Sequence, residues 1–523
     1  MKMFRVFLSC LGLPLIILLC SLSNRTLAAK LRAIPLSTTL ASYNADIPFQ
    51  PSPLPSLPPQ GEGNVPPSST HVKEKAYYVA PYGNDNNPGT WEMPWRTVQK
   101  AADTLVAGDT VYLRQGVYSE RVRLQNTGEP GKEIIYMAYP GEIAVIDGEK
   151  IPLPDDLVGL FEIVDQRYIR INGLHVSNSG PYADNAAVLI VNSEYITVEN
   201  STTFNTASSG VGVWNSREIV IANNKVERAG IGGGQECITL AGSSDFEVQE
   251  NLVIDCQKEG IDVKDGSFHG TIVRNVVDHP RAVGIYVDAW DKPTHDITVS
   301  RNIVFGSVES SGFTLASEMG GLLTNIRLEN NLAYRNYTYG IEVSRCCSGS
   351  HPMEGIFLIN NTLYRNGVDW GGGIIQDNHQ AENVLVRNNI VSQNLTFQIA
   401  VAADVPAESA TIDHNLIDGY RGYEDEVYGE DYLEGDAGFV DPAMLDLHLT
   451  STSIAIDQGS QLAAPSVDFD GDLRPVGNGY DIGADEWQGK VYLPIVGKMD
   501  VFLRGLLFAI PFILLLIPTI LCF

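Results

Sequence analysis

The chain has 523 residues, of which 44% are hydrophobic, and its 63 acidic and 35 basic side chains give a formal net charge of −28. A chain of this length can bury a large core, and its 49 glycines favour a turn-rich β architecture. The excess of negative charge argues against a nucleic acid partner, because phosphate binding requires clustered Lys and Arg.

The first 75 residues divide into an apolar leader and a linker. Lys2 and Arg5 precede a long apolar run that ends in small residues. This is the pattern of a secretory signal peptide over residues 1–29, although such a run can also be retained as an anchor. Residues 30–75 are rich in proline and lack periodicity, so they predict an extended linker. We therefore expect an exported protein.

The folded part is predicted to begin near residue 76 with a strand, a turn-rich loop and a short helix. Residues 95–106 have apolar side chains at helical spacing. A helix there would cover the first open edge of a repetitive β structure. Residues 77–118, YYVAPYGNDNNPGTWEMPWRTVQKAADTLVAGDTVYLRQGVY, resemble the start of secreted pectate-lyase-like β-helix proteins, a group that includes polysaccharide lyases and glycoside hydrolases.

Four copies of a short sequence motif, Gly–apolar–variable–apolar–polar, predict the repeating unit of the central region. They occupy residues 260–264, 284–288, 312–316 and 340–344, at intervals of 24 to 28 residues. Successive side chains of a strand face opposite ways, so the apolar positions point inward and the variable ones outward. One such strand per period is typical of a solenoid coil.

A column of asparagines has the same period. At intervals of 24 to 30 residues the sequence has Asn200, Asn224, Asn251, Asn275, Asn302, Asn331, Asn361, Asn389 and Asn415. Coils stacked about 4.8 Å apart would bring these amides into a hydrogen-bonded ladder, and Asn tolerates the left-handed backbone of a turn. We predict an all-β, right-handed parallel β-helix over residues 76–420, with the handedness taken from the general crossover rule and from known solenoids.

Residues 421–488 are predicted to form an acidic loop and a C-terminal cap. We interpret the acidic cluster as a solvated loop in preference to a cation site; its members are Glu424, Asp425, Glu426, Glu430, Asp431, Glu434 and Asp436. Residues 438–487 resemble a segment appended to bacterial surface β-helix proteins, through the runs 453–459, 468–475 and 481–486. Alternating aspartates around Gly471 could bind Ca²⁺, but no bidentate Glu stands at the EF-hand position, so we favour a structural cap.

The C-terminal end is apolar and follows a spacer at residues 489–504. Residues 505–523 carry no charge and are 19 residues long, just enough to span a bilayer. The sequence therefore predicts a membrane anchor and a cell-surface location, with a secreted form as the alternative. Residues 493–497, LPIVG, resemble a sortase signal of the LPxTG type with Val496 in place of Thr. We expect a monomer.

Four of the seven cysteines lie in the expected exported body: Cys237, Cys256, Cys346 and Cys347. Cys237 and Cys256 fall within one coil, so a disulfide between them is possible in an oxidising compartment. The sequence leaves open whether either pair is oxidised.

Polar side chains are concentrated on the outer face of about four coils, and this is the main functional signal. Aligning the repeats gives one column of Asp262, Tyr286, Thr314 and Glu342, and a second of Lys264, Asp288, Ala316 and Ser344. The turns that follow add Asp265 and Arg345, with Trp290 and Glu318 one step beyond. The neighbouring residues 211–214 and 238–241 carry no charge.

In a first hypothesis Lys264 is the Brønsted base of a lyase that acts on a uronic-acid polymer. β-Elimination removes a proton α to a carboxylate, which Arg281, Arg345 or Ca²⁺ would neutralise. The candidate Ca²⁺ ligands are Asp262, Asp265, Asp288 and Asp291. Residues 259–264, EGIDVK, resemble the strand that carries the catalytic lysine in one β-helical pectate lyase group, but residues 282–286 lack the calcium-binding aspartates of that group. Otherwise Lys264 forms only a salt bridge with a neighbouring acid.

In a second hypothesis two carboxylates hydrolyse a glycosidic bond. Asp288 and Glu318 are the best pair, with Asp262 as a substitute. Carboxylates on adjacent coils would lie about 5 Å apart, which suits a retaining mechanism, whereas two coils, near 10 Å, approach the geometry of an inverting one. The expected substrate contacts are Tyr286, Trp290, Arg281, Glu342 and Arg345, with the two aromatic rings stacking on sugars.

In a third hypothesis the same face catalyses nothing. It binds a glycan, or the protein is an adhesin of the cell surface, and the polar columns are a solvated face.

Overall fold

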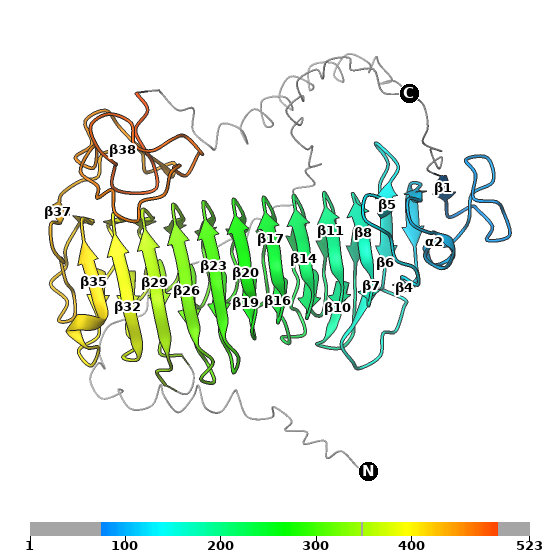
Figure 1. The fold of residues 1–523 in the computed structure, drawn as a ribbon, viewed down its shortest axis with the longest axis horizontal. Coiled ribbons are helices and arrows are strands. Elements are labelled where there is room, and N and C mark those ends of the chain that lie inside the picture. The colour runs from blue at the N-terminus through cyan, green and yellow to red at the C-terminus, as the bar shows by residue number, and fades with distance from the viewer. Residues whose placement is uncertain (1–74, 347–348, 490–523) are drawn as a thin grey trace, which may run out of the picture. The chain divides into compact units, whose positions relative to one another are not determined.

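The computed structural model describes residues 75–346 and 349–489, and these fold into a parallel β-helix flanked by one compact segment (Figure 1). Each coil contributes one strand to each of three sheets, so every sheet runs the length of the helix. Figure 1 shows the strands of sheet A lying side by side in coil order. The predicted all-β solenoid is confirmed.

Sheets A and B each contain 13 strands, and sheet C contains 11. Sheet A is formed by β1 (Ala76–Val79), β2 (Thr110–Leu113), β5 (Ile134–Ala138), β8 (Arg167–Asn172), β11 (Glu194–Glu199), β14 (Arg217–Ala222), β17 (Ser244–Gln249), β20 (Phe268–Val273), β23 (Thr294–Ser300), β26 (Leu323–Glu329), β29 (Met353–Ile359), β32 (Ala381–Arg387) and β35 (Ala410–Asp413). Sheet B is formed by β3 (Gly116–Tyr118), β6 (Ala144–Asp147), β9 (His175–Ser177), β12 (Thr202–Phe204), β15 (Lys225–Glu227), β18 (Leu252–Ile254), β21 (Val276–Asp278), β24 (Ile303–Phe305), β27 (Leu332–Tyr334), β30 (Thr362–Tyr364), β33 (Ile390–Ser392), β36 (Leu416–Asp418) and β37 (Leu433–Glu434).

The strands of sheet C contain the repeated sequence motif. This sheet is formed by β4 (Val122–Arg123), β7 (Val158–Val164), β10 (Asn185–Val191), β13 (Val211–Trp214), β16 (Ile238–Ala241), β19 (Ile261–Lys264), β22 (Ile285–Asp288), β25 (Phe313–Ala316), β28 (Ile341–Val343), β31 (Gly372–Gln376) and β34 (Phe397–Val401). Outside the three sheets lie the helix α2 (Val98–Thr104), the short 3₁₀ helix η1 (Ala407–Ser409) and the antiparallel pair β38 (Phe439–Asp441) and β39 (Asp446–Leu449).

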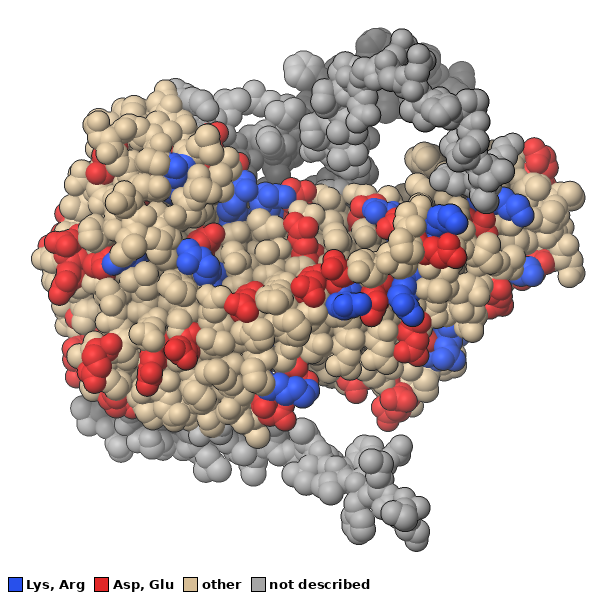
Figure 2. Space-filling view, in the orientation of Figure 1, with Lys and Arg blue, Asp and Glu red and all other residues tan. Residues whose placement is uncertain are grey.

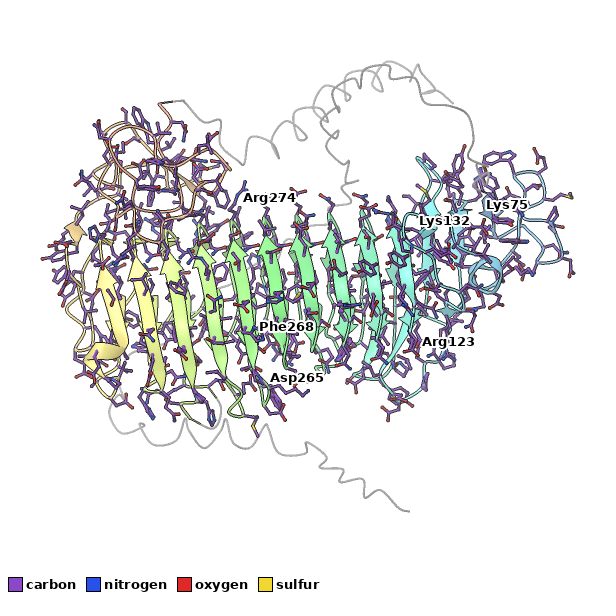
Figure 3. All side chains as sticks on the ribbon, viewed as in Figure 1. Lys75, Arg123, Lys132, Asp265, Phe268 and Arg274 are labelled. Carbon is purple, nitrogen blue, oxygen red and sulfur yellow. A yellow bond between two sulfur atoms is a disulfide. The ribbon has the colours of Figure 1, made fainter. Side chains whose placement is uncertain are left out.

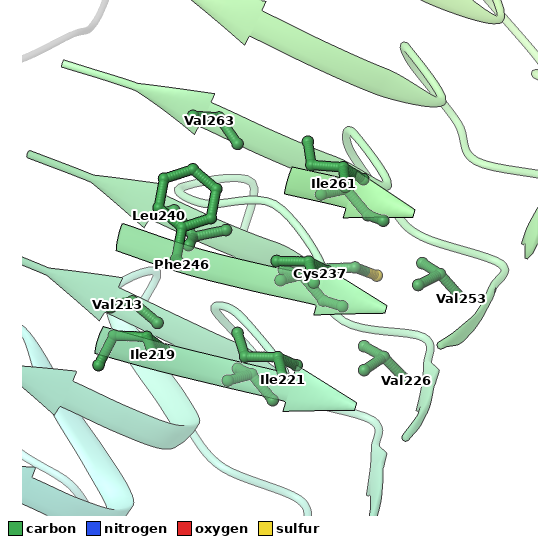
Figure 4. Packing of buried hydrophobic residues seen from close by; sticks show 14 of the residues in the cluster. Val213, Ile219, Ile221, Val226, Cys237, Leu240, Phe246, Val253, Ile261 and Val263 are labelled. Carbon is green, nitrogen blue, oxygen red and sulfur yellow. The ribbon is translucent and has the colours of Figure 1, made fainter. Parts of the chain in front are cut away.

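The core consists of apolar side chains that point inward from all three sheets and stack from coil to coil. Ile261 and Val263 are fully buried, and they lie beside Ile238 and Leu240 of the preceding strand (Figure 4). The side chain of Cys237 lies in the same layer and forms a disulfide with Cys256, with the two Cα atoms 5.8 Å apart. That pairing, which the sequence left open, is therefore present in the structure.

The asparagine ladder is present, with one of its predicted members displaced. From Asn224 to Asn389 each buried side-chain amide donates to the Oδ1 of the next ladder asparagine at 2.9–3.0 Å, and the ladder ends at Asn415. Asn200 is not a rung: Ser201 takes that place, because its backbone N–H donates to the Oδ1 of Asn224. The left-handed φ angle also belongs to the residue before each rung, such as Asn223 at 55°, and not to the rung itself.

The predicted N-terminal helix is shorter than its apolar pattern. It spans Val98–Thr104, and the hydroxyl of Thr97 caps it by accepting the backbone N–H of Lys100 at 3.1 Å. The ring of Trp95 stacks on Tyr77 at 4.7 Å, just before the helix begins. Val98, Ala101 and Ala102 are buried against the first coils, so the helix covers the open edge as expected.

The acidic loop closes the far end of the helix. Its backbone bonds to the last strand of sheet C, with Val427 N–H donating to Ile399 and Val401 N–H donating to Asp425. The carboxylate of Glu426 is buried and accepts backbone N–H groups from Gln398 and from residues 421–423. Glu426 thus holds the loop on the coil, while most of the cluster is exposed as predicted.

Residues 438–489 do not cover the end of the coils but lie along their flank, beside the turns between sheets A and B (Figure 1). Arg301 donates to the carbonyl of Phe469 at 2.8 Å, and Asn360 donates to the carbonyl of Asp481 at 2.9 Å. The carboxylate of Asp468 accepts backbone N–H groups of Gly471, Asp472 and Glu486. Asp468 therefore fastens the backbone of this aspartate run within the segment.

Several sequence predictions fall on parts of the chain outside the described residues. These are the signal peptide, all but the last residue of the linker, Cys347, the sortase-like residues 493–497 and the apolar residues 505–523. Within residues 75–346 and 349–489, no helix is both long and apolar enough to cross a bilayer.

Candidate active site on the outer face of sheet C

The strand pairing gives the predicted outward column on sheet C. Asp262 on β19 lies beside Tyr286 on β22, which lies beside Thr314 on β25, and Thr314 lies beside Glu342 on β28. Residues in the connections before and after these strands flank the column, so several outward side chains are buried although they do not belong to the core. The polar face is therefore partly enclosed.

Lys264 lies in a cluster of buried acids that the sequence only partly revealed. Its Nζ is 2.7 Å from Oε2 of Glu236 and 3.0 Å from Oδ2 of Asp262. Lys258 contacts the other oxygen of Glu236 at 2.8 Å and lies 3.6 Å from Glu259. Of the two acids considered as salt-bridge partners of Lys264, Asp288 and Asp262, the structure shows Asp262, and Glu236, 1% exposed, is the main partner that we missed.

A sequence signal for these additional residues did exist. Glu236 and Glu259 both stand two residues before a strand of sheet C, and those strands are neighbours with Ile238 opposite Ile261. Acids at the same offset in successive coils lie near one another, because coils stack in register.

The charges of this cluster keep Lys264 protonated. Burial alone would lower the pKa of Lys264, but the charges of Asp262 and Glu236 outweigh burial and raise it. Burial likewise opposes ionisation of Glu236, yet the two lysines lower its pKa to about 2. An ammonium group held between carboxylates does not accept a proton, so the geometry argues against Lys264 as a base.

A second group of side chains surrounds Asp288 at the end of β22. Its Oδ1 accepts the backbone N–H of Glu318 at 3.2 Å, and Glu318 in turn accepts the phenol of Tyr286 at 2.6 Å. Asp288 is 1% exposed, and burial raises the pKa of its carboxyl to about 7. Trp290 lies at the margin and is 43% exposed. The structure thus brings together Tyr286, Asp288 and Glu318, as the column alignment predicted.

The remaining predicted contacts are engaged elsewhere. Arg281 pairs with Glu309 at 3.1 Å, and both side chains are exposed. Glu342 accepts hydroxyls from Ser311 at 2.9 Å and Ser344 at 3.0 Å. Arg345 contacts Asp377 at 3.4 Å and Asp404 at 2.8 Å, beyond Glu342 along the same face. No arginine of this set contacts the Asp288 group in the described residues.

The four proposed Ca²⁺ ligands do not form one site. Asp265 lies in the turn from β19 to β20 (Figure 3), where it pairs with Lys292 at 2.9 Å, and Asp291 is exposed. Asp262 faces the ammonium of Lys264, and Asp288 is bonded to backbone N–H groups. The residues present therefore do not fit a calcium ion at this position, since Asp262 and Asp265 each face a lysine and Asp288 accepts a backbone N–H.

In residues 75–346 and 349–489, one group of three potential metal ligands lies close together, and it belongs to the flanking segment. It consists of His448, Asp470 and Asp485. Nδ1 of His448 is 2.5 Å from Asp446 and Nε2 is 2.9 Å from Asp470, so both ring nitrogens already contact carboxylates. This arrangement holds a charged imidazolium, whose nitrogens are not ligands.

Basic and acidic side chains are interspersed on the visible face of the molecule. In Figure 2 the Lys and Arg side chains of the described residues lie beside Asp and Glu and form no extended basic patch. This agrees with the excess of acidic residues in the whole sequence.

Comparison with known proteins places these features in a family context. The chain matches the Pel9A-like right-handed β-helix region over residues 77–230 and a general right-handed β-helix region over residues 160–321. It is 27% identical over 381 residues to the uncharacterized protein YwoF of Bacillus subtilis (strain 168), covering 65% of this chain and 79% of YwoF.

Two further relatives are pectate lyases. Pectate lyase PEL9 of Emericella nidulans is 35% identical over 116 residues, which are 20% of this chain and 28% of PEL9. The crystal structure of pectate lyase Pel9A has a TM-score of 0.50 at 18% identity, covering 79% of this chain and 96% of that one. The matches to residues 77–321 and the coil architecture agree with the resemblance seen in the opening of the sequence. These matches support a relation to the pectate-lyase-like proteins with a right-handed parallel β-helix.

Proposed function

We propose that the protein is an extracellular enzyme that cleaves a polysaccharide on the outer face of sheet C. The observation that carries this proposal is the buried carboxyl of Asp288, whose pKa burial raises to about 7. Its Oδ1 accepts the backbone N–H of Glu318, a second acid whose charge also raises the pKa of Asp288. Two acids in different environments are the usual arrangement for one to donate a proton while the other stays ionised.

The chemistry that these groups support best is glycoside hydrolysis. Protonated Asp288 donates its proton to the glycosidic oxygen as the bond to the anomeric carbon breaks. Glu318, held by the phenol of Tyr286 at 2.6 Å, acts as the ionised partner that takes a proton from the attacking water. The oxygen of this water bonds to the anomeric carbon, so one proton is given and one is recovered.

β-Elimination is the second candidate, and the similarity to pectate lyases favours it. It needs a base and a cation that neutralises a uronate carboxylate. Lys264 is a poor base here because it is bonded to Asp262 and Glu236. The ammonium groups that could neutralise a substrate already neutralise buried acids, so hydrolysis is the leading proposal.

The extracellular location rests on the sequence. The leader at residues 1–29 supports export, and the apolar residues 505–523 support retention at a membrane. A disulfide between Cys237 and Cys256 is consistent with an oxidising compartment. We expect the protein to act as a monomer on an extended glycan.

The experiment that tests the proposal is a screen of the purified protein against neutral and uronic-acid polysaccharides, with Ca²⁺ and with a chelator. Reducing ends and the absorbance of unsaturated uronate would be followed together. We expect new reducing ends without that absorbance, and equal rates in Ca²⁺ and in chelator.

Each other outcome has a defined meaning. A rise in both signals on an acidic polymer would establish β-elimination and reject hydrolysis. A loss of either signal in chelator would show that cleavage depends on a metal ion and reject the expected independence from Ca²⁺. Binding without any cleavage would make the protein a glycan-binding or adhesin-type surface protein.

A further inference from the structure

Four aromatic side chains form a cluster at the C-terminal end of sheet C that no part of the proposed chemistry uses. They are Tyr339, Trp370, Phe397 and Tyr423, which we call the aromatic platform. The ring of Trp370 lies 5.6 Å from Tyr339, 6.0 Å from Phe397 and 6.4 Å from Tyr423, nearly perpendicular to each. Phe397 stacks on Tyr423 at 5.4 Å.

Strand register places the aromatic platform on the same outer face as the candidate active site. Glu342 lies beside Ile375 on β31, and Ile375 lies beside Ala400 on β34, so the outward column continues past the polar coils. Ile375 and Ala400 form an apolar cluster with Phe397, separate from the main core, and Tyr339 and Tyr423 pack against it.

Trp370 is exposed but held in place. Its side chain is 44% exposed, whereas Phe397 beneath it is fully buried. The following residue, Gly371, has a φ angle of +124°, and a Cβ at that position would lie 2.0 Å from the carbonyl oxygen of Thr338. Only glycine fits there, so the backbone next to Trp370 has little freedom. An exposed ring supported by three others is pre-organised for binding.

The charged groups near the aromatic platform disfavour an anionic sugar. Glu342 and Asp377 are the acids closest to Tyr339, and Arg345 is already paired with Asp377 and Asp404. A neutral sugar can pack its C–H groups on an aromatic ring and donate its hydroxyls to the surrounding acids. It therefore suits both the aromatic rings and the negative charge at this place.

We propose that the aromatic platform is a distal binding subsite for neutral sugar units of an extended polysaccharide. Trp370 stands two residues before β31, and β31 lies three coils beyond β22, which ends at Asp288. The two strands are about 14 Å apart along the coil axis for coils about 4.8 Å apart, and the two residues are also offset along the strand direction, because they stand at opposite strand ends. A glycan lying along sheet C could reach both places at once, whereas a short oligosaccharide at Asp288 could not. This inference rests on the proposed function and extends it, because it implies that the substrate cleaved at Asp288 is a polymer.

The test is binding and not cleavage, so that it can fail independently of the proposed function. The full-length protein and its Trp370→Ala variant would be run in native gels containing xylan, galactan, arabinan, β-glucan or polygalacturonate. We expect at least one neutral polymer to retard the wild type, and Trp370→Ala to weaken that binding by 5-fold or more. Trp370→Tyr should retain most of it.

A matched control is available at the other end of the molecule. Trp91 is 42% exposed, close to the 44% of Trp370, and lies beside Tyr78 and Arg114. Trp91→Ala should bind as the wild type does. The proposal is overturned if no neutral polymer retards the wild type, if only polygalacturonate does, or if Trp370→Ala and Trp91→Ala behave alike. Asp288→Asn should keep the binding, which separates this subsite from the chemistry.

Discussion

At the scale of single residues, the outer face of sheet C holds two kinds of buried carboxyl group. Glu236 is stabilised as an anion by two lysines, so its pKa falls to about 2. Asp288 has backbone N–H partners but no lysine beside it, so burial dominates and its pKa rises to about 7. Buried carboxyl groups on this face therefore form an ion pair where lysines are near, and have a raised pKa where none is.

Asp288→Asn should abolish cleavage while leaving the fold intact. We expect a loss of about 100-fold or more, the usual contribution of a general acid. In the wild type, kcat/KM should fall as the pH rises through about 7, because Asp288 then loses the proton that it donates. A steady-state pH profile on the best polymer checks this, and a profile that still rises above pH 8 would contradict it.

The same substitution should stabilise the protein at alkaline pH. The folded pKa of Asp288 lies above the unfolded value of about 3.8, so the folded state binds the extra proton. Its contribution to stability therefore falls between pH 4 and pH 7 and stays low above that range. Relative to wild type, Asp288→Asn should raise the Tm more at pH 8 than at pH 4. An equal effect at both pH values would show that the carboxyl is not titrating in this way.

Lys264→Met should destabilise the protein rather than selectively remove catalysis. It leaves Glu236 and Asp262 buried with one ammonium fewer, and breaking such a pair costs about 3–5 kcal/mol. The double variant Lys264→Met/Glu236→Gln should recover part of that loss in urea unfolding. If Lys264→Met instead kept full stability and lost all activity, Lys264 would be the base after all.

At the scale of secondary-structure elements, the turns from sheet A to sheet B determine how the coils stack. In each of these turns from Asn224 onward, a buried amide bonds to the coils on both sides, while a left-handed residue precedes it. The ladder therefore satisfies backbone groups that would otherwise be buried without partners.

Asn302→Ala should cost about 2–3 kcal/mol of unfolding free energy. The Oδ1 of Asn302 accepts two N–H groups of Asn275, and its side-chain amide donates to Ile272 and Asn331. The substitution therefore leaves buried donors and acceptors without hydrogen-bond partners. Asn200→Gly is the control, because Asn200 lies outside the ladder at a φ of 51° that glycine also accepts. Urea titration should show little change there, and equal losses at both sites would reject the ladder as the cause.

At the scale of the whole molecule, the flanking segment 438–489 joins parts of the chain far apart in sequence. Arg387, buried in the coils, donates to the carbonyl of Leu462, and buried Arg474 pairs with Glu486 at 3.0 Å. The segment thus adds a small core of its own to the side of the β-helix.

The attachment of this segment should weaken at alkaline pH. Asp446 and Asp470 contact both nitrogens of His448, and with Asp485 they outweigh burial and raise its pKa to about 9. The pKa of His448 in the folded state exceeds the usual 6.5, so the protonated imidazole stabilises the folded segment by on the order of 2 kcal/mol. This contribution is complete below pH 6.5 and is lost as the pH rises through about 9. Limited proteolysis within residues 438–489 should accelerate between pH 7 and pH 9.5. The His448→Gln variant should be cut quickly at both pH values; a wild type insensitive to pH would refute the idea.

The repeat of the sequence was sufficient to predict the fold and the columns of sheet C. A period of 24 to 30 residues with alternating apolar positions leaves few alternatives to stacked coils, and it put Asp262, Tyr286, Thr314 and Glu342 in the right register. The ladder was also predictable, except at Asn200, where a shift of one residue exchanges the rung with Ser201.

The partners of the charged side chains were decided only by the tertiary structure. The connections between strands vary in length and conformation, so periodicity does not say which of their residues fold back over the sheet. Lys264 meets Glu236, 28 residues away, and Trp370 meets Tyr423 from the loop that closes the helix. Spacing along the chain determines which strands are neighbours, because backbone hydrogen bonding forces one register. Burial and charge at the site depend on connections that no repeat constrains, so sequence alone determined the scaffold and the fold determined its electrostatics.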